Sequence, residues 1–185
     1  MTLKSFSFDD YNLKKADAYL KKYPKGKEQS AIKALLDLAQ RQNDGWLSKE
    51  CIEYVATFLD IPFIKAMEIA SFYTMFNLKP VGKFHVKVCC TTPCWLNGAD
   101  DIKEKILKYL NVDLDEITND GLITVSEVEC LGACVNGPVM QINDDFFEDL
   151  DEASALLLIQ KIKENKPIQS GSAVGRQCSK AYSQE

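Results

Sequence analysis

The sequence predicts an α+β protein in two parts, a small helical bundle over residues 1–80 and a mixed α/β domain over residues 81–165. Apolar residues recur at helical spacing in the first part and alternate at strand spacing where the second part begins. The segment 77–83 between these patterns contains a proline and a glycine, as linkers do. The last residues, 166–185, are polar and without periodicity, so we expect a flexible tail there.

Four short helices are expected in the first part. Apolar residues follow the i, i+3, i+4, i+7 stripe in three segments, 13–20, 32–39 and 52–59. Ser48 suits the N-cap of the third helix, and Pro62 suits the first position of the fourth. The fourth helix has apolar residues on two sides between Ala66 and Phe76, which predicts that it is buried all round. Because four short helices make little core alone, we expect the bundle to pack on a partner subunit.

The second part predicts strands and helices in the order β-α-β-β-β-α. This order is typical of a layer of helices on a mixed sheet, as in thioredoxin-like domains. A hairpin turn is expected at 143–145, where asparagine and aspartate residues follow an apolar run. The strands and helices are expected at 84–89, 102–110, 122–129, 139–142, 146–147 and 155–162.

Composition narrows the classes of function. The chain has 185 residues, a net charge of -5 and no concentrated basic patch, which argues against nucleic acid and anionic membranes as partners. No apolar run approaches the roughly 20 residues of a membrane span, and the first residues lack the apolar core of a secretory signal. No G-x-G-x-x-G or phosphate-binding loop is present, so the chain itself is not expected to bind NADH or flavin.

Seven cysteines favour metal or redox chemistry over a disulfide framework, which an odd count fits poorly. Cys89 and Cys94 are spaced C-x4-C and Cys130 and Cys134 C-x3-C, each pair after a predicted strand. We therefore expect four thiolates at one end of the sheet, where they would suit zinc or an iron–sulfur centre. A [2Fe–2S] rhomb takes two cysteines per iron, which matches two loops with one pair each. A four-cysteine zinc site stays an alternative at this point.

Residues beside the cysteines suit such a centre. Gly132 can take the left-handed backbone that a loop wrapped around sulfur needs. Thr91 and Thr92 can donate hydroxyl hydrogen bonds to sulfur, which would raise a reduction potential. Trp95 and Leu96 are candidates for shielding the centre from water, and packing beneath the following helix is an equal alternative for Trp95.

Two long stretches carry a family resemblance. VCCTTPCWLNGADDI (88–102) and VECLGACVNGPVMQINDDFFEDL (128–150) resemble the thioredoxin-like [2Fe–2S] subunit of the NADH-quinone oxidoreductases, respiratory complex I. The segments LLDLAQRQNDGWL (35–47) and ASFYTMFNLKPVGKFHV (70–86) extend the likeness, which covers about residues 7–165. The resemblance implies a thioredoxin-like [2Fe–2S] ferredoxin domain after the bundle.

The same resemblance implies the cofactor, the partners and the role. One [2Fe–2S] cluster would be held by Cys89, Cys94, Cys130 and Cys134. The chain would dock on the subunit that binds FMN and NADH, in a complex that also holds a large iron–sulfur subunit. It would exchange single electrons with FMN as a transient electron store, without a complete active site of its own. The complex passes electrons from NADH to quinone with proton translocation, and its peripheral arm lies on the cytoplasmic face of the bacterial inner membrane or the mitochondrial matrix side.

Other interpretations stay open beside this one. The same module occurs in NAD-dependent formate dehydrogenases and NAD-reducing hydrogenases, and a stand-alone thioredoxin-like ferredoxin or a zinc-stabilised interaction module would also carry four cysteines. The chain departs from the family at Cys90, where threonine is usual, and at Gly137, where alanine is usual. Cys90 offers a rival C-x3-C pair with Cys94, but strand alternation points it away from Cys89, so we expect a small buried hydrophobe.

A few residues receive no role in the site. Cys51 is expected in or beside the helical core, and Cys178 lies in the predicted tail. His85, the single histidine, is expected on the surface of its strand. The sequence leaves the isomer of Pro138 open, and the acidic residues of 144–149 are expected to form a solvated hairpin edge.

Overall fold

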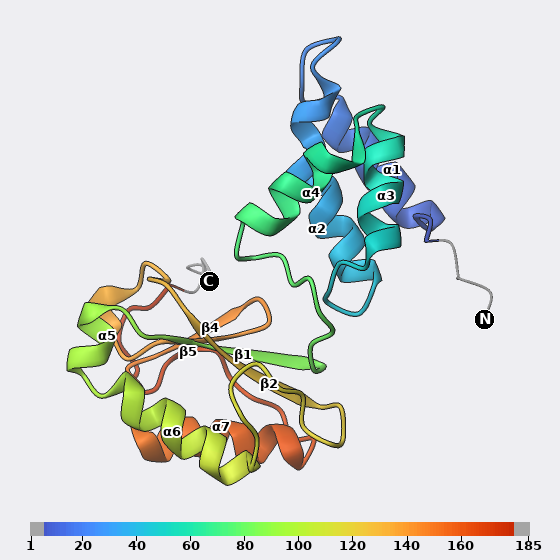
Figure 1. Ribbon diagram of the computed structural model, residues 1–185. Helices are drawn as coiled ribbons and strands as arrows, with labels where there is room; N and C mark the ends of the chain where they lie inside the picture. Colours follow the sequence, from blue (N-terminus) through green and yellow to red (C-terminus); the bar gives the residue numbers. More distant parts are fainter. Residues whose placement is uncertain (1–5, 180–185) are drawn as a thin grey trace. The chain divides into compact units, whose positions relative to one another are not determined.

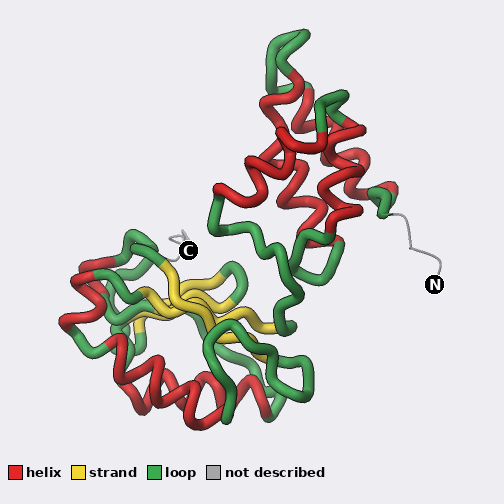
Figure 2. Tube along the Cα trace, viewed as in Figure 1, coloured by secondary structure: helices red, strands yellow, loops and turns green. Residues whose placement is uncertain are grey.

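A computed structural model describes residues 6–179 of the chain, which divides into two compact units, 1–80 and 81–185 (Figure 1). The first unit is helical, and the strands of the sheet all lie in the second (Figure 2). Each unit has its own cluster of buried apolar side chains. None of the described helices is long and apolar enough to cross a membrane.

Helix α3 of the first unit begins where the sequence predicts, whereas α4 begins at Phe63, so that Pro62 is its N-cap and not its first residue. Ser48 caps α3, because its hydroxyl accepts a hydrogen bond from the backbone N–H of Cys51 at 3.3 Å. Leu35, Leu36 and Val55 of the predicted stripes are fully buried, and each contributes about 2 kcal/mol by leaving water. The elements are α1 (Asp10–Leu20), the 3-10 helix η1 (Glu28–Ala31), α2 (Ile32–Gln42), α3 (Lys49–Phe58) and α4 (Phe63–Phe72).

The prediction that α4 is buried all round is wrong for this chain. Ala66 and Ala70 are buried against the bundle, but Ile64 is 58% exposed and Phe72 is 76% exposed. The helix ends at Phe72, so Phe76 lies beyond it in the following turn, where it is buried. Two small alanines let α4 approach the other helices closely, and Met67 and Ile69 pack half-buried beside them, whereas Ile64 and Phe72 face outward.

A five-stranded mixed sheet forms the second unit, in the order β2-β1-β3-β4-β5. Strand β1 runs parallel to the edge strand β2 and antiparallel to β3. Helices α6 and α7 lie together beneath the sheet in Figure 1, and Ile106 and Ile159 join Val86 in one core. The elements are β1 (Phe84–Cys89), α5 (Thr92–Leu96), α6 (Ala99–Leu110), β2 (Ile123–Val128), η2 (Cys134–Asn136), β3 (Met140–Ile142), β4 (Asp145–Glu148), α7 (Glu152–Lys163) and β5 (Gly171–Ser172). The thioredoxin-like α+β prediction is confirmed, with α5 and β5 as additional elements.

His85 is buried, contrary to the expectation of a surface position. The segment between α6 and β2 runs along the edge of β2, where Asp115 donates its backbone N–H to the carbonyl of Val125 at 2.8 Å. The ring Nε2 of His85 lies 2.8 Å from the hydroxyl of Ser126, which donates to Asp115 at 2.5 Å. An alternating strand pattern alone cannot reveal that Ser126 and Asp115, distant in sequence, supply polar partners for a buried imidazole.

The expected flexible tail is also corrected over residues 171–179. Gly171–Ser172 pairs with β4 in parallel register as the edge strand β5. Ala173 then donates its backbone N–H to the carbonyl of Glu148 at 2.9 Å. Two-residue strands leave no periodicity for a sequence pattern to detect, because backbone hydrogen bonds alone define them. Residues 180–185 of the expected tail lie outside the described part of the chain.

Candidate metal centre

The cysteine pairs follow the carboxyl ends of two neighbouring parallel strands, β1 and β2. Cys89 is the last residue of β1 and is level with Val128, the last residue of β2. Cys94 lies in α5, directly after β1, and Cys130 follows β2 by two residues. Cys134 opens η2 a short turn further on. Because the carboxyl ends of parallel strands meet at one edge of a sheet, both loops lie side by side there.

The four thiols form one group. The Sγ atoms of Cys130 and Cys134 are 3.2 Å apart, and Cys89 forms a thiol hydrogen bond with Cys94. The two pairs are close enough to interact electrostatically, Cys89 with both Cys130 and Cys134. Cys89 and Cys94 are buried, whereas Cys130 and Cys134 are exposed. The group is therefore closed by protein on one side and open on the other.

The two thiols of each pair differ in pKa. Burial opposes ionisation of Cys89, but hydrogen bonds from Thr91 and from the Leu131 backbone outweigh it and lower its pKa. Burial, and then the hydrogen bond with Cys89, raise the pKa of Cys94 to about 12. In the other loop the hydrogen bond between the thiols lowers the pKa of Cys130 and raises that of Cys134. In each pair the pKa of one thiol is lowered and that of its neighbour is raised, and a bound metal must displace the protons that remain.

Comparison with known proteins identifies this arrangement. The family model of thioredoxin-like [2Fe-2S] ferredoxins matches residues 16–163. The chain belongs to the thioredoxin-like [2Fe-2S] ferredoxin family. Its relatives include a subunit of the NADH-quinone oxidoreductase of Rickettsia typhi, 56% identical over 85% of this chain and 92% of the relative. A second is the mitochondrial NADH dehydrogenase [ubiquinone] flavoprotein 2 of Dictyostelium discoideum, 50% identical over 90% of this chain and 67% of the relative.

A solved structure supports the fold. An NAD+-reducing [NiFe]-hydrogenase in the air-oxidized state superposes with a TM-score of 0.64 at 21% identity. The alignment covers 74% of this chain and 23% of the hydrogenase chain. At that identity the likeness concerns the fold of the ferredoxin module.

Membership of this family means that the chain carries one [2Fe–2S] cluster, and the grouped thiols fit one. Cys130 and Cys134 lie 3.2 Å apart, Cys89 interacts with Cys94 and with both of them, and four thiolates are the donor set that would hold a [2Fe–2S] cluster. The backbone N–H of Gly132 donates to Cys130 Sγ at 3.4 Å, and Thr91 Oγ1 lies 3.4 Å from Cys89 Sγ. Gly132 has a φ of 85°, the left-handed conformation predicted for this loop.

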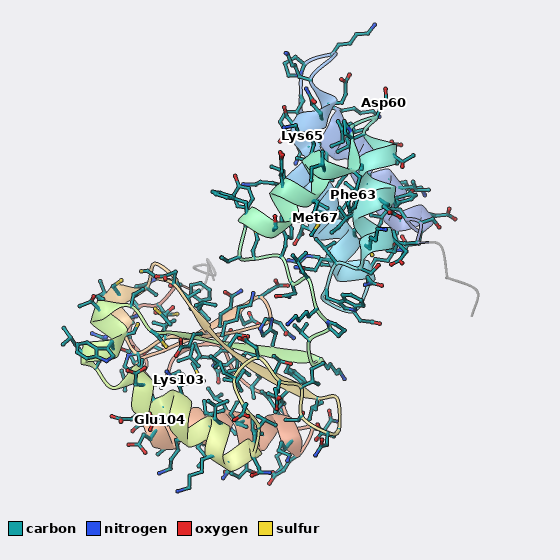
Figure 3. The ribbon with its side chains drawn as sticks, in the orientation of Figure 1. Asp60, Phe63, Lys65, Met67, Lys103 and Glu104 are labelled. Carbon is teal, nitrogen blue, oxygen red and sulfur yellow. The ribbon has the colours of Figure 1, made fainter. Side chains whose placement is uncertain are left out.

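Cys90 faces away from this group. Its thiol lies 3.5 Å from the carbonyl of Val88 and packs against the apolar core, and burial raises its pKa to about 11. The ligand atoms of Cys90, Asp100 and Glu127 lie within 4.8 Å of one another, as in a small metal site. However, the ammonium of Lys103, labelled on α6 in Figure 3, already forms ion pairs with both carboxylates. Lys103 therefore already occupies the carboxylates of Asp100 and Glu127 that a metal ion would need.

The turn after Cys134 lies close against the other pair. A Cβ added to Gly137 would lie 3.2 Å from Cys94 Sγ, so glycine leaves slightly more room here than alanine. The Gly137–Pro138 peptide is cis, which resolves the isomer that the sequence left open. The other cysteines stay apart from the site: Cys51 is buried in α3, and the thiol of Cys178 lies against Gly171.

Three exposed apolar residues directly follow Cys94 and Cys134 in the sequence, and we call them the apolar rim. Trp95 is 55% exposed, Leu96 is 70% exposed and Val135 is 88% exposed. The exposure of Trp95 argues against packing beneath the next helix, and its role in shielding the centre stays a prediction. Sequence reasoning missed Val135, since a single valine between a cysteine and an asparagine carries no periodic signal.

Proposed function

We propose that this chain is the [2Fe–2S] subunit of an NADH-quinone oxidoreductase that exchanges single electrons with FMN held by a partner subunit. The observation that carries the proposal is the four-thiol group, present in a chain 56% identical to a named subunit of that enzyme over nearly the whole length of the relative. The assembled enzyme oxidises NADH, reduces quinone and translocates protons, and this chain contributes a redox centre to it. The hydrogenase likeness concerns the fold, so it does not favour the hydrogenase alternative.

The proposed ligands are Cys89 and Cys94 for one iron and Cys130 and Cys134 for the other. When bound, the cluster supplies one-electron oxidation and reduction. The chain's own groups tune it: the Thr91 hydroxyl and the Gly132 N–H donate toward sulfur and stabilise the more negative, reduced state. Because Cys89 and Cys94 are buried, the protein excludes water from their side of the metal centre.

The open side is the proposed route for electrons. Cys130 and Cys134 are exposed, and so are the rim residues Trp95, Leu96 and Val135. We assign this rim to the FMN- and NADH-binding subunit, since exposed aromatic and aliphatic side chains are typical anchors of interfaces. Docking there would cover the sulfurs and bring the flavin within reach.

The helical unit supplies a second proposed contact in the same assembly. Ile64, Phe72 and Met75 are exposed apolar side chains on α4 and the turn after it. A face of this kind is usually covered in a stable complex, and the large iron–sulfur subunit is the proposed neighbour. The chain would then lie in the peripheral arm, on the cytoplasmic or matrix side of the membrane.

Transfer of an electron from the reduced chain to the partner's flavin tests the proposal. The chain is reduced with dithionite, freed of reductant and mixed anaerobically with the FMN-loaded partner subunit. We expect the EPR signal of the chain to disappear while the absorbance of oxidised FMN falls, and neither change with the FMN-free partner. Persistence of the EPR signal beside fully oxidised FMN would contradict the proposal.

A further inference from the structure

The C-terminal segment 171–179, which we call the strap, packs against the loop that carries Cys134. The strap begins as β5, paired with β4. The family match ends at residue 163, so the strap lies outside the matched part of the chain. In Figure 1 this last described segment, coloured red, runs beside the orange stretch that contains η2.

Side-chain contacts join the strap to η2. The Nη2 of Arg176 donates to the carbonyl of Val135 at 3.1 Å, and the guanidinium also pairs with Asp149. The amide Nδ2 of Asn136 donates to the carbonyl of Gln177 at 2.6 Å. Val135 and Asn136 are the two residues directly after Cys134, so the strap holds both of its successors.

The buried carboxylate of Glu148 connects the strap to η2. Glu148 is 1% exposed, contrary to the solvated edge expected for the acidic residues of 144–149, and its Oε2 accepts a hydrogen bond from Asn136 Nδ2 at 2.8 Å. Its Oε1 accepts a hydrogen bond from the backbone N–H of Ser179 at 2.8 Å. One oxygen of Glu148 is therefore satisfied by the cysteine loop and the other by the strap. Departure of the strap would leave a buried carboxylate oxygen without its partner, which is strongly unfavourable.

We propose that the strap is a positioning element that keeps η2 closed over the metal centre, so that detachment of the strap permits Cys134 to leave the metal. The inference rests on the proposed ligand role of Cys134. No residue of the strap is proposed as a ligand; Arg176 acts through the Val135 carbonyl, and Ser179 acts through Glu148 and Asn136. The strap therefore controls how long the centre retains its iron.

Iron release from the cluster-loaded chain to an excess of a ferrous chelator tests this role. We expect Arg176→Ala to release iron about fivefold faster and deletion of residues 169–185 at least about thirtyfold faster. Arg176→Lys, which keeps one charged donor, should recover part of the wild-type rate. Arg41→Ala is the matched control, because Arg41 pairs with Asp37 at 2.9 Å within α2 and should leave the rate unchanged. Wild-type rates in both Arg176→Ala and the deletion would overturn the inference.

Hydrogen exchange separates this inference from the proposed function. Asp149 donates its backbone N–H to the carbonyl of Asn136 at 2.7 Å, so its exchange reports closure of η2. In the metal-free chain, this amide should exchange about fivefold faster in the Arg176→Ala variant than in the wild type. Unchanged exchange would contradict the proposed role of the strap. A wild-type chain that never holds iron and sulfide would overturn the proposed function, while this exchange comparison would still decide the strap.

Discussion

The Oγ1 of Thr91 lies 3.4 Å from the Sγ of Cys89, and the same hydroxyl also helps to lower the pKa of Cys130. Thr91 stands between β1 and α5, so one short side chain reaches a sulfur of each pair. Against metal-bound thiolates the hydroxyl can only donate. It then favours the reduced cluster, which carries one more negative charge.

Thr91→Val should lower the reduction potential. Valine keeps the shape of threonine without its donor, and one hydrogen bond of about 1 kcal/mol corresponds to about 40 mV for one electron. An EPR-monitored redox titration measures the change. Thr92→Val is the control, because no hydrogen bond to sulfur is found for Thr92 among the described residues. An unchanged potential in Thr91→Val would remove this role.

Cys89→Ser and Cys90→Ser should differ sharply although the residues are neighbours. Cys89 belongs to the thiol group, whereas the Cys90 thiol lies beside Val88 and the apolar core. We expect Cys90→Ser to retain two irons and two sulfides per chain and Cys89→Ser to lose the cluster or shift its spectrum. Iron and sulfide assays with visible absorption measure both. The reverse result would make Cys90 the ligand.

The imidazole of His85 should titrate far below its usual range. Burial, followed by the charge of Lys87, lowers its pKa to about 4, and nearby Asp115 opposes the shift. The chain has one histidine, so its NMR signals are identified without assignment. Lys87→Gln should raise the pKa toward 6.5. A pKa near 6.5 in the folded wild-type chain would show that the ring is solvated.

The depressed pKa of His85 also sets a pH window for stability. The unfolded chain takes up this proton below about pH 6.5, and the folded chain does so only near pH 4. The stabilisation is therefore complete above pH 6.5 and is lost as the pH falls toward 4. From pH 7 to 5 we expect a loss of about 2 kcal/mol in the free energy of unfolding, measured with urea. His85→Gln should reduce this pH dependence.

Charge placed on the apolar rim should prevent docking. Leu96→Glu or Trp95→Glu would bury a carboxylate in the proposed interface, which should weaken binding to the FMN-binding subunit by about thirtyfold. Tyr109→Glu is the control, because Tyr109 is an exposed aromatic residue of α6 outside the rim. Titration calorimetry measures the affinities. Equal affinities in all three variants would place the interface elsewhere.

Features with a local or periodic signal were predictable from the sequence. The stripe of Leu35 and Leu36, the cap at Ser48 and the left-handed Gly132 each depend on neighbouring residues, and the structure places them as expected. The cysteine spacing predicted the thiol group because two parallel strands end together. His85 and the strap were missed for the opposite reason, since their surroundings come from segments distant in sequence. The exposed faces of Trp95 and Phe72 depend on packing that hydrophobicity alone does not specify.

Metal content and EPR of the purified chain test the central claim most directly. The chain is produced with iron and sulfide available, assayed for both, reduced with dithionite and examined at low temperature. We expect two irons and two sulfides per chain and a rhombic S = 1/2 signal, as a [2Fe–2S] cluster on four cysteines gives. A colourless chain with one tightly bound zinc, silent in EPR after the same treatment, would contradict the account.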